Sequence, residues 1–230
     1  MTAEHRTRPI RLLVADDQEL VRAGLSLLLG MEPDLDVVVQ LSDGADVADA
    51  VAEHGIDVAI LDIEMPYDGL RATADIAALN RNGRDEGHDG RGRDDAHQGS
   101  GDGACRVLIV TTFGRTGYLQ RAMAAGASGF MVKDAPAEAL AQAVRTVNAG
   151  GRAVDPALAA EALAAGPSPL TAREMEVLSA AGDGSSVRAI ASRLHLAPGT
   201  VRNHLSSAIA KTGASNRMEA NRTAQARGWL

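Results

Sequence analysis

Residues 10–20 read IRLLVADDQEL, a short apolar run that ends in two adjacent aspartates. The run suits a strand buried on both faces of a sheet, and the leucines of residues 20–29 recur at helical spacing. Four more apolar runs follow along the chain, at 37–41, 58–61, 106–110 and 129–132. Strands that alternate with helices in this way predict an α/β domain with a doubly wound, parallel, five-stranded sheet.

Polar residues stand where these predicted strands end. They are Asp16 and Asp17 after the first strand, Asp62 after the third, Thr111 after the fourth and Lys133 after the fifth. In an open parallel sheet this edge binds ligands. Carboxylates gathered there repel one another unless a cation neutralises them, and oxygen ligands favour Mg²⁺ over zinc. An aspartate beside Mg²⁺, with a hydroxyl and an ammonium opposite, is equipped to accept a phosphoryl group.

Composition limits the class of protein. The 230 residues allow one large domain or two small ones, and 45% hydrophobic with 23% charged residues is typical of a globular chain. The single cysteine, Cys105, excludes an internal disulfide and fits a reducing compartment. No apolar run is long enough to span a bilayer or to form the core of a signal peptide. We therefore expect a cytoplasmic protein with no membrane partner.

The charge is distributed unevenly along the chain. The net charge is −7, but residues 168–230 hold eight Arg and Lys against four Asp and Glu, which gives +4 for the tail and −11 for the remainder. An acidic front and a basic tail indicate two domains, of which the second is suited to meet a polyanion.

Two stretches interrupt the pattern of strands and helices. Residues 80–103 carry seven glycines and ten charged residues, so we expect a disordered insertion between the third helix and the fourth strand. Its His88 and His97 lack the paired spacing of metal ligands, and solvated loop histidines are the better interpretation. Residues 150–167, rich in Ala, Gly and Pro, are expected to link a front domain (9–149) to a tail domain (168–230).

Four motifs of the front domain together resemble the receiver domain of bacterial two-component response regulators: LLVADDQELVRAGL, LDIEMP, RVLIVTTFGR and AGASGFMVKD. The resemblance implies a flavodoxin-like fold in which a sensor histidine kinase phosphorylates Asp62. It further implies Mg²⁺ ligation by Asp17 and Asp62 directly, by Asp16 through water and by the Glu64 backbone carbonyl, a switch hydroxyl on Thr111, a phosphate-binding Lys133 and an aromatic switch at Phe130. One departure is MPYDG, which has one residue between MP and the acid–glycine pair where the family usually has two.

The tail shows the pattern of an all-α helix-turn-helix domain. Thr171, followed three residues later by Glu174, predicts a capping box at the start of a helix. A short helix at about 186–194 and a turn precede a second helix with a buried apolar stripe. Its opposite face carries Arg202, Asn203 and Ser206. Arginine there can bind guanine or phosphate, and asparagine can bind adenine.

The tail motifs LTAREMEVL, AIASRLHL, GTVRNHL and NRMEA resemble the LuxR-type helix-turn-helix of the NarL/FixJ family. The resemblance implies that Arg202, Asn203 and Ser206 contact double-stranded DNA. Ala197-Pro198 stands where a serine usually caps the recognition helix, and Ser206 replaces what is often a basic residue. We therefore expect the monomer to bind DNA with modest affinity and to need to form a homodimer. TTFGRTGYLQRAM and the C-terminal NRMEANRTAQARGWL look most like the DesR-like branch.

These features predict a DNA-binding response regulator and not an enzyme, with RNA polymerase as the further partner that transcription regulation implies. Phosphorylation of Asp62 is expected to draw Thr111 and Phe130 inward and to favour dimers. Two alternatives stay open. An aspartyl-phosphate phosphatase needs a second aspartate two residues after its nucleophile, where this chain has Glu64. A phosphorylation-independent regulator has no need of the full acidic set with Lys133, although the shortened loop keeps this alternative open.

Overall fold

The computed structural model describes residues 8–86, 104–112 and 114–230, and the chain divides into two compact units. One unit comprises the chain up to Gly114 together with Ala122–Pro156, and the other comprises Arg115–Arg121 together with Ala157–Leu230. The stretch expected to be a linker, 150–167, is thus divided between them. No helix in the described part of the chain combines the length and the apolar character that crossing a membrane requires.

The first unit is built on a parallel sheet that contains the five predicted strands and a sixth. The strands are β1 (Ile10–Ala15), β2 (Leu35–Leu41), β3 (Val58–Leu61), β4 (Arg106–Thr111), β5 (Gly129–Val132) and β6 (Ala153–Val154), in the spatial order β2-β1-β3-β4-β5-β6. The sixth strand corrects the predicted count. It pairs with β5 inside the expected linker, and its two residues are too few to give a periodic sequence signal.

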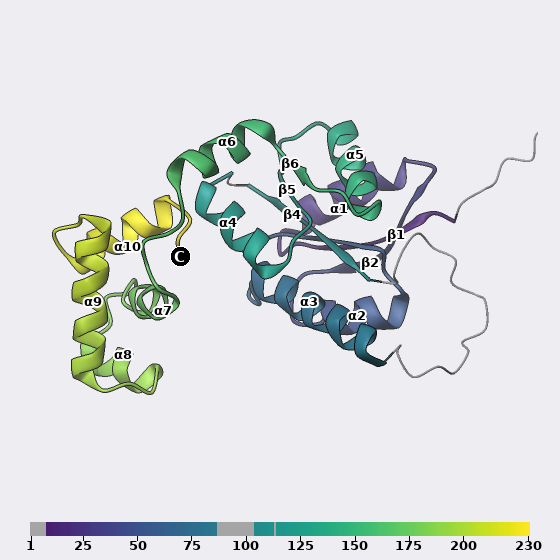
Figure 1. Ribbon diagram of the computed structural model, residues 1–230. Coiled ribbons are helices and arrows are strands. Elements are labelled where there is room, and N and C mark those ends of the chain that lie inside the picture. The colour runs from purple at the N-terminus through teal and green to yellow at the C-terminus, as the bar shows by residue number, and fades with distance from the viewer. Residues whose placement is uncertain (1–7, 87–103, 113) are drawn as a thin grey trace, which may run out of the picture. The chain divides into compact units, whose positions relative to one another are not determined.

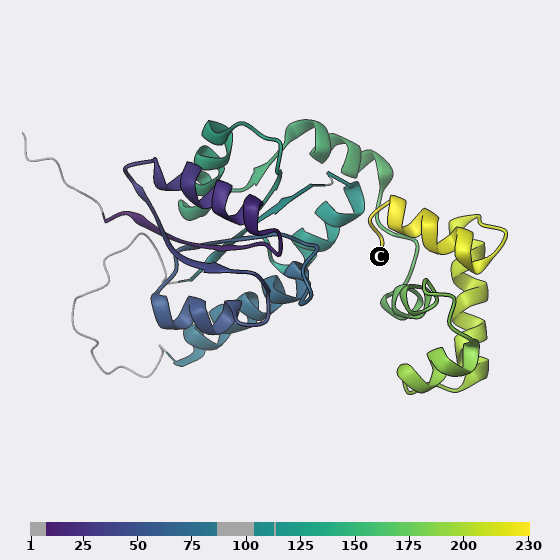
Figure 2. The same cartoon turned by 180° about the vertical axis from the view of Figure 1, so that it is seen from behind.

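Helices cover both faces of this sheet, with α1 and α5 on one face and α2 and α3 on the other (Figures 1 and 2). The bounds are α1 (Glu19–Gly30), α2 (Val47–His54), α3 (Gly69–Glu86) and α5 (Ala137–Asn148), whereas α4 (Thr116–Ala125) is divided between the two units. β3 is buried along its whole length, and so is all but the first residue of β4. Cover on both faces explains why these strands read as continuous apolar runs.

The end of α3 differs from the prediction of a disordered stretch that begins at residue 80. Residues 80–86 continue the helix, because a helix that is nucleated by packed apolar turns extends readily through arginine and glutamate. Asn80 anchors it: its Nδ2 donates to the Cys105 carbonyl at 2.8 Å, and its Oδ1 accepts from the Cys105 N–H at 3.1 Å. The rest of the predicted loop, with His88 and His97, lies outside the described residues.

The second unit is helical, with α6 (Pro156–Ala165), α7 (Ala172–Ala180), α8 (Val187–Arg193), α9 (Pro198–Thr212) and α10 (Arg217–Ala226). α6 occupies most of the stretch expected to be a flexible linker, because its alanines are also the strongest helix formers. The later helices enclose a core that includes Val177, Leu178, Ile190, Val201 and Trp229.

Candidate functional site

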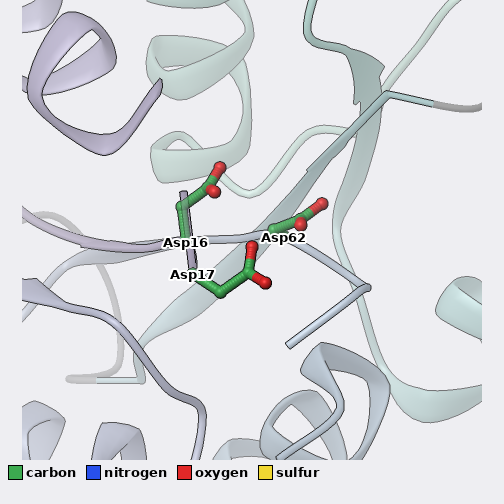
Figure 3. A group of neighbouring side chains, drawn as sticks. All are labelled: Asp16, Asp17 and Asp62. Carbon is green, nitrogen blue, oxygen red and sulfur yellow. The ribbon is translucent and has the colours of Figure 1, made fainter. Parts of the chain in front are cut away.

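The C-terminal edge of the sheet brings three carboxylates together. Asp16 and Asp17 follow β1, and Asp62 follows the neighbouring β3. The Asp62 N–H donates to the Ala15 carbonyl at 2.9 Å, so strand pairing itself fixes the spacing of the acids. One oxygen from each carboxylate lies within 4.8 Å of the others, and the three side chains point to the same side in Figure 3. The predicted gathering of these acids at one edge of the sheet is therefore present.

Two of these three acids are buried. Asp16 is 1% exposed and Asp62 is 3% exposed, whereas Asp17 is open to solvent. Burial raises the pKa of Asp62; the Lys133 ammonium opposes this rise, and the charge of Asp16 adds to it. A carboxylate that is costly to ionise in this position is one that a bound cation would stabilise.

Lys133 reaches the acids from the end of β5. Its Nζ lies 2.6 Å from Asp16 Oδ2 and 3.2 Å from Asp62 Oδ2. Among the residues that the structure describes, neither Lys133 Nζ nor Asp16 Oδ2 has a partner in hydrogen-bond geometry, in spite of their short separation. The distance shows that the two charges attract each other, and the missing alignment leaves both buried atoms able to bond to a further polar group.

Thr111 lies beside this lysine at the end of β4, and Phe130 precedes it on β5. The Lys133 N–H donates to the Thr111 carbonyl at 2.8 Å, which joins the ends of β4 and β5. Thr111 is 1% exposed, and Phe130 on β5 is fully buried. The expected inward movement of these two side chains presupposed an outward starting position. The structure instead holds both of them inside.

The shortened loop after Asp62 is closed and does not separate the acids. The Ile63 carbonyl accepts from the Met65 N–H at 3.0 Å and from the Gly69 N–H at 3.1 Å. A Cβ atom at Gly69 would lie 1.9 Å from the Asp62 carbonyl oxygen, so the start of α3 must be glycine. The Glu64 side chain is exposed and lies outside the cluster of three acids; the contact expected from its backbone carbonyl stays a prediction.

Two residues that the sequence patterns did not single out hold the loops of this edge. Arg22 Nη1 donates to the Asp16 carbonyl at 2.6 Å from α1. Asp43, between β2 and α2, accepts from the Tyr67 N–H at 2.9 Å. An arginine within a helix and an aspartate before a glycine are typical of a solvated face and a turn, so neither carried a signal of its own.

The three residues predicted to contact DNA lie on one helix, α9. Arg202, Asn203 and Ser206 are exposed, whereas Val201 and Leu205 are buried in the core of the second unit. The Ala197 N-cap makes no side-chain hydrogen bond, as the sequence predicted, and proline occupies the first turn. The turn between α8 and α9 contains His195 at a φ of 52°, a left-handed conformation that is uncommon outside glycine.

Glu174 joins α7 to α9. It accepts from the Thr171 N–H at 2.8 Å, and its own N–H donates to Thr171 Oγ1, which completes the predicted capping box. The same carboxylate accepts from Ser207 Oγ at 2.6 Å and from Lys211 Nζ at 2.7 Å. Burial would raise the pKa of Glu174, but the hydrogen bonds from Lys211 and Ser207 outweigh it and lower the pKa to about 2. This cluster orients α9.

Known proteins resemble the chain in both units. Residues 12–84 match the response regulator receiver domain, and residues 168–224 match the luxR family of bacterial regulatory proteins. The chain is 37% identical to the transcriptional regulatory protein DesR of Bacillus subtilis, over 96% of this chain and 99% of DesR. It is 34% identical to the DNA-binding transcriptional activator DevR/DosR of Mycobacterium tuberculosis, over 92% of each. It also resembles the crystal structure of ChrA, a response regulator of a heme-sensing two-component system, with a TM-score of 0.53, 32% identity and coverage of 97% and 100%.

Proposed function

The chain belongs to the bacterial response regulators that join a receiver domain to a LuxR-type DNA-binding domain, and on this premise we propose that Asp62 accepts a phosphoryl group from a sensor histidine kinase in the cytoplasm. The observation that carries the proposal is the position of Lys133. Its ammonium lies within 3.2 Å of both Asp16 and Asp62 and keeps a hydrogen-bonding capacity that the described residues do not use. A phosphoryl oxygen bound to Asp62 supplies the acceptor.

The acidic set fits Mg²⁺. Three carboxylates offer oxygen ligands alone, and the buried Asp16 Oδ2 has no hydrogen bond within the described part of the chain. Asp17 and Asp62 would hold the ion directly, Asp16 through water and Glu64 through its backbone carbonyl. When bound, the ion neutralises the clustered acids and the oxygens of the incoming phosphoryl group.

The positions of the side chains support the following transfer. A carboxylate oxygen of Asp62 attacks the phosphorus of the donor phosphohistidine, the O–P bond forms, and the P–N bond breaks with its electron pair returning to the imidazole. Lys133 Nζ donates to one phosphoryl oxygen, and the Thr111 hydroxyl donates to another. Both groups belong to neighbouring strand ends that are tied by the Lys133–Thr111 backbone hydrogen bond.

The response is proposed to be a population shift. The acyl phosphate stabilises the inward positions of Thr111 and Phe130 that this structure already holds. This form favours a homodimer whose two α9 helices enter adjacent major-groove half-sites of double-stranded DNA. The operator is then contacted by Arg202, Asn203 and Ser206. RNA polymerase is the partner whose activity the bound dimer regulates.

Intact mass measurement after incubation with acetyl phosphate and Mg²⁺ tests the phosphorylation. Wild-type protein is expected to gain one phosphoryl group, and Asp62→Ala none. The second candidate is the phosphorylation-independent regulator, which the shortened loop after Asp62 leaves open at the level of sequence; it gains no mass in either form. Turnover of small phosphate esters would instead favour a phosphatase, a class that places aspartate where this chain has Glu64.

Operator binding at fixed salt tests the recognition face. Arg202→Ala is expected to weaken binding by about 1–3 kcal/mol. Arg222→Ala, which removes an exposed arginine from α10, serves as the matched control. Equal affinities for wild type and Arg202→Ala would mean that another face of the domain meets the DNA.

A further inference from the structure

The loop that follows Asp62 is fixed at its base by its own backbone. The Ile63 carbonyl accepts from the N–H groups of Met65 and Gly69, which closes residues 63–69 into a compact turn before α3. Asp68 Oδ1 accepts from the Leu70 N–H at 2.6 Å and begins the helix. These contacts shape the base of the loop, but they leave its outer arm at Tyr67 to be held from elsewhere.

The Asp43 carboxylate holds that outer arm. Asp43 lies in the loop between β2 and α2, and its Oδ1 accepts from the Tyr67 N–H at 2.9 Å and from the Ala45 N–H at 3.2 Å. One oxygen atom therefore orders its own loop and ties it to the loop that begins at Asp62. α2 and α3, which follow these two loops, lie side by side on the same face of the sheet (Figure 1).

Two glycines show how closely these segments approach. A Cβ atom at Gly44 would lie 2.4 Å from the Tyr67 carbonyl oxygen, and one at Gly69 would lie 1.9 Å from the Asp62 carbonyl oxygen. Gly44 has no left-handed φ, so close approach and not backbone conformation requires glycine there. Backbone contact therefore runs from Gly44 through Tyr67 and Gly69 to Asp62.

We propose that Asp43 is a positioning residue for the acidic site, because its hydrogen bond to Tyr67 fixes the backbone that follows Asp62. This inference rests on the proposed phosphorylation of Asp62. The hydrogen bond from Tyr67 to Asp43 is effective because the loop is short. Only four residues separate Asp62 from Tyr67, so a displacement of the backbone at Tyr67 also displaces the Asp62 carboxylate. Glu64, whose backbone carbonyl is proposed to face the ion, lies within the same arm.

Three variants test this inference. Asp43→Ala removes the acceptor. Asp43→Asn removes the charge but keeps an oxygen that can accept from Tyr67. Asp46→Ala is the matched control, since Asp46 follows in the same loop and makes no side-chain cap to α2. Three quantities are measured for each: the exchange rate of the Tyr67 amide proton by NMR, the Mg²⁺ dissociation constant by calorimetry, and the initial rate of phosphorylation by acetyl phosphate in saturating Mg²⁺.

Asp43→Ala is expected to weaken Mg²⁺ binding and to slow phosphorylation by about tenfold each, with faster exchange at the Tyr67 amide. Asp43→Asn should restore all three quantities to within about twofold of wild type, because an amide oxygen accepts the same hydrogen bond. Asp46→Ala should behave as wild type. Rescue by asparagine separates positioning of the loop from a simple effect of charge.

Two results overturn the inference. One is an Asp43→Ala protein with faster Tyr67 exchange but wild-type Mg²⁺ affinity and phosphorylation. The other is an Asp43→Asn protein that is as impaired as Asp43→Ala. If Asp43→Ala does not fold, Gly44→Ala decides the question, since its Cβ displaces the Tyr67 carbonyl and should give the same losses. A wild-type protein that gains no phosphoryl group contradicts the proposed function. The Mg²⁺ affinities and the Tyr67 amide exchange rates of the variants still test the positioning role of Asp43 in that case.

Discussion

The chain contains two lysines, one in each domain, and both lie against buried carboxylates. Lys211 approaches Glu174 at 2.7 Å, and Ser207 donates to the same carboxylate, so the hydrogen bonding of this acid is complete. Lys133 approaches Asp16 at 2.6 Å, yet neither of the two facing atoms has a hydrogen bond to any residue that the structure describes. One cluster is satisfied within the protein, and the other is left to be completed.

The two clusters separate a contribution to stability from a contribution to chemistry. Buried polar groups with complete hydrogen bonds help to specify a fold, whereas incomplete ones lower stability and are expected where a ligand completes them. The acids respond in opposite ways. Burial dominates at Asp62 and raises its pKa. At Glu174 the hydrogen bonds from Lys211 and Ser207 outweigh burial and lower the pKa to about 2.

The largest effect is expected when Lys133 is removed. Lys133→Ala should slow phosphorylation of Asp62 by roughly a hundredfold, because it removes the charged donor to a phosphoryl oxygen. The measurement is the rate of mass gain with acetyl phosphate in saturating Mg²⁺. The bound ion then neutralises the charge of the acids that the missing lysine no longer offsets. Lys211→Ala is the control and should react at the wild-type rate. Equal loss in the two variants would erase the distinction between the clusters.

Removal of Lys211 should act on stability instead. Lys211→Ala is expected to lower the free energy of unfolding of the C-terminal domain by roughly 1–3 kcal/mol, since it leaves the buried Glu174 carboxylate without its opposite charge. The effect stays below that of a fully buried pair because the lysine side chain is 35% exposed. Urea unfolding followed by the fluorescence of Trp229, the chain's single tryptophan and part of this core, measures it. A Trp229 transition that shifts equally in Lys133→Ala would contradict the assignment.

Asp62→Asn is expected to stabilise the receiver domain in the absence of Mg²⁺ by roughly 1 kcal/mol, because the neutral amide removes a charge that burial disfavours. Thermal unfolding followed by circular dichroism gives the shift. Saturating Mg²⁺ should reverse the order, since the wild-type carboxylate then gains a ligand. Glu174→Gln should lower the unfolding free energy of the other domain. If Asp62→Asn also lowers the unfolding free energy of its domain, the two buried acids do not differ as proposed.

The smallest effect is expected in mild acid. The folded pKa of Glu174 lies below its ordinary value of 4.5, so its stabilisation is present above pH 4.5 and is lost as the pH falls toward 2. The difference in unfolding free energy between wild type and Glu174→Gln should therefore narrow as the pH falls from 5, by less than about 1 kcal/mol at pH 4. Trp229 fluorescence in urea at each pH measures this difference in unfolding free energy. A difference that widens as the pH falls would mean that the pKa of Glu174 is raised in the folded protein.

The sequence predicted the elements that bury apolar residues on a regular period. β1, β3 and β5 match their apolar runs, and the helix indicated by the leucines of residues 20–29 is observed as Glu19–Gly30. Burial on both faces makes such strands legible as uninterrupted aliphatic runs. The helix predicted to carry the recognition face could be predicted for a similar reason, because Val201 and Leu205 lie one turn apart on its buried side.

What the sequence could not predict depends on contacts that are distant in the chain. β6 is a strand only because β5 offers it an edge, and α3 continues past residue 80 where Asn80 bonds to Cys105. The strand-end acids were recognisable by position. Asp43 was not, because its role arises from a loop 24 residues away. Tertiary partners of this kind leave no periodic signal.

The pairing of both lysines also makes the chain its own reporter in chemical labelling. An amine-reactive reagent meets two lysine side chains, one 10% exposed beside the acids and one 35% exposed on α9, while arginine carries the positive charge elsewhere. Acylation of Lys133 follows events in the receiver, and acylation of Lys211 follows the packing of α7 on α9. A single peptide map can thus read the two domains separately in the same sample.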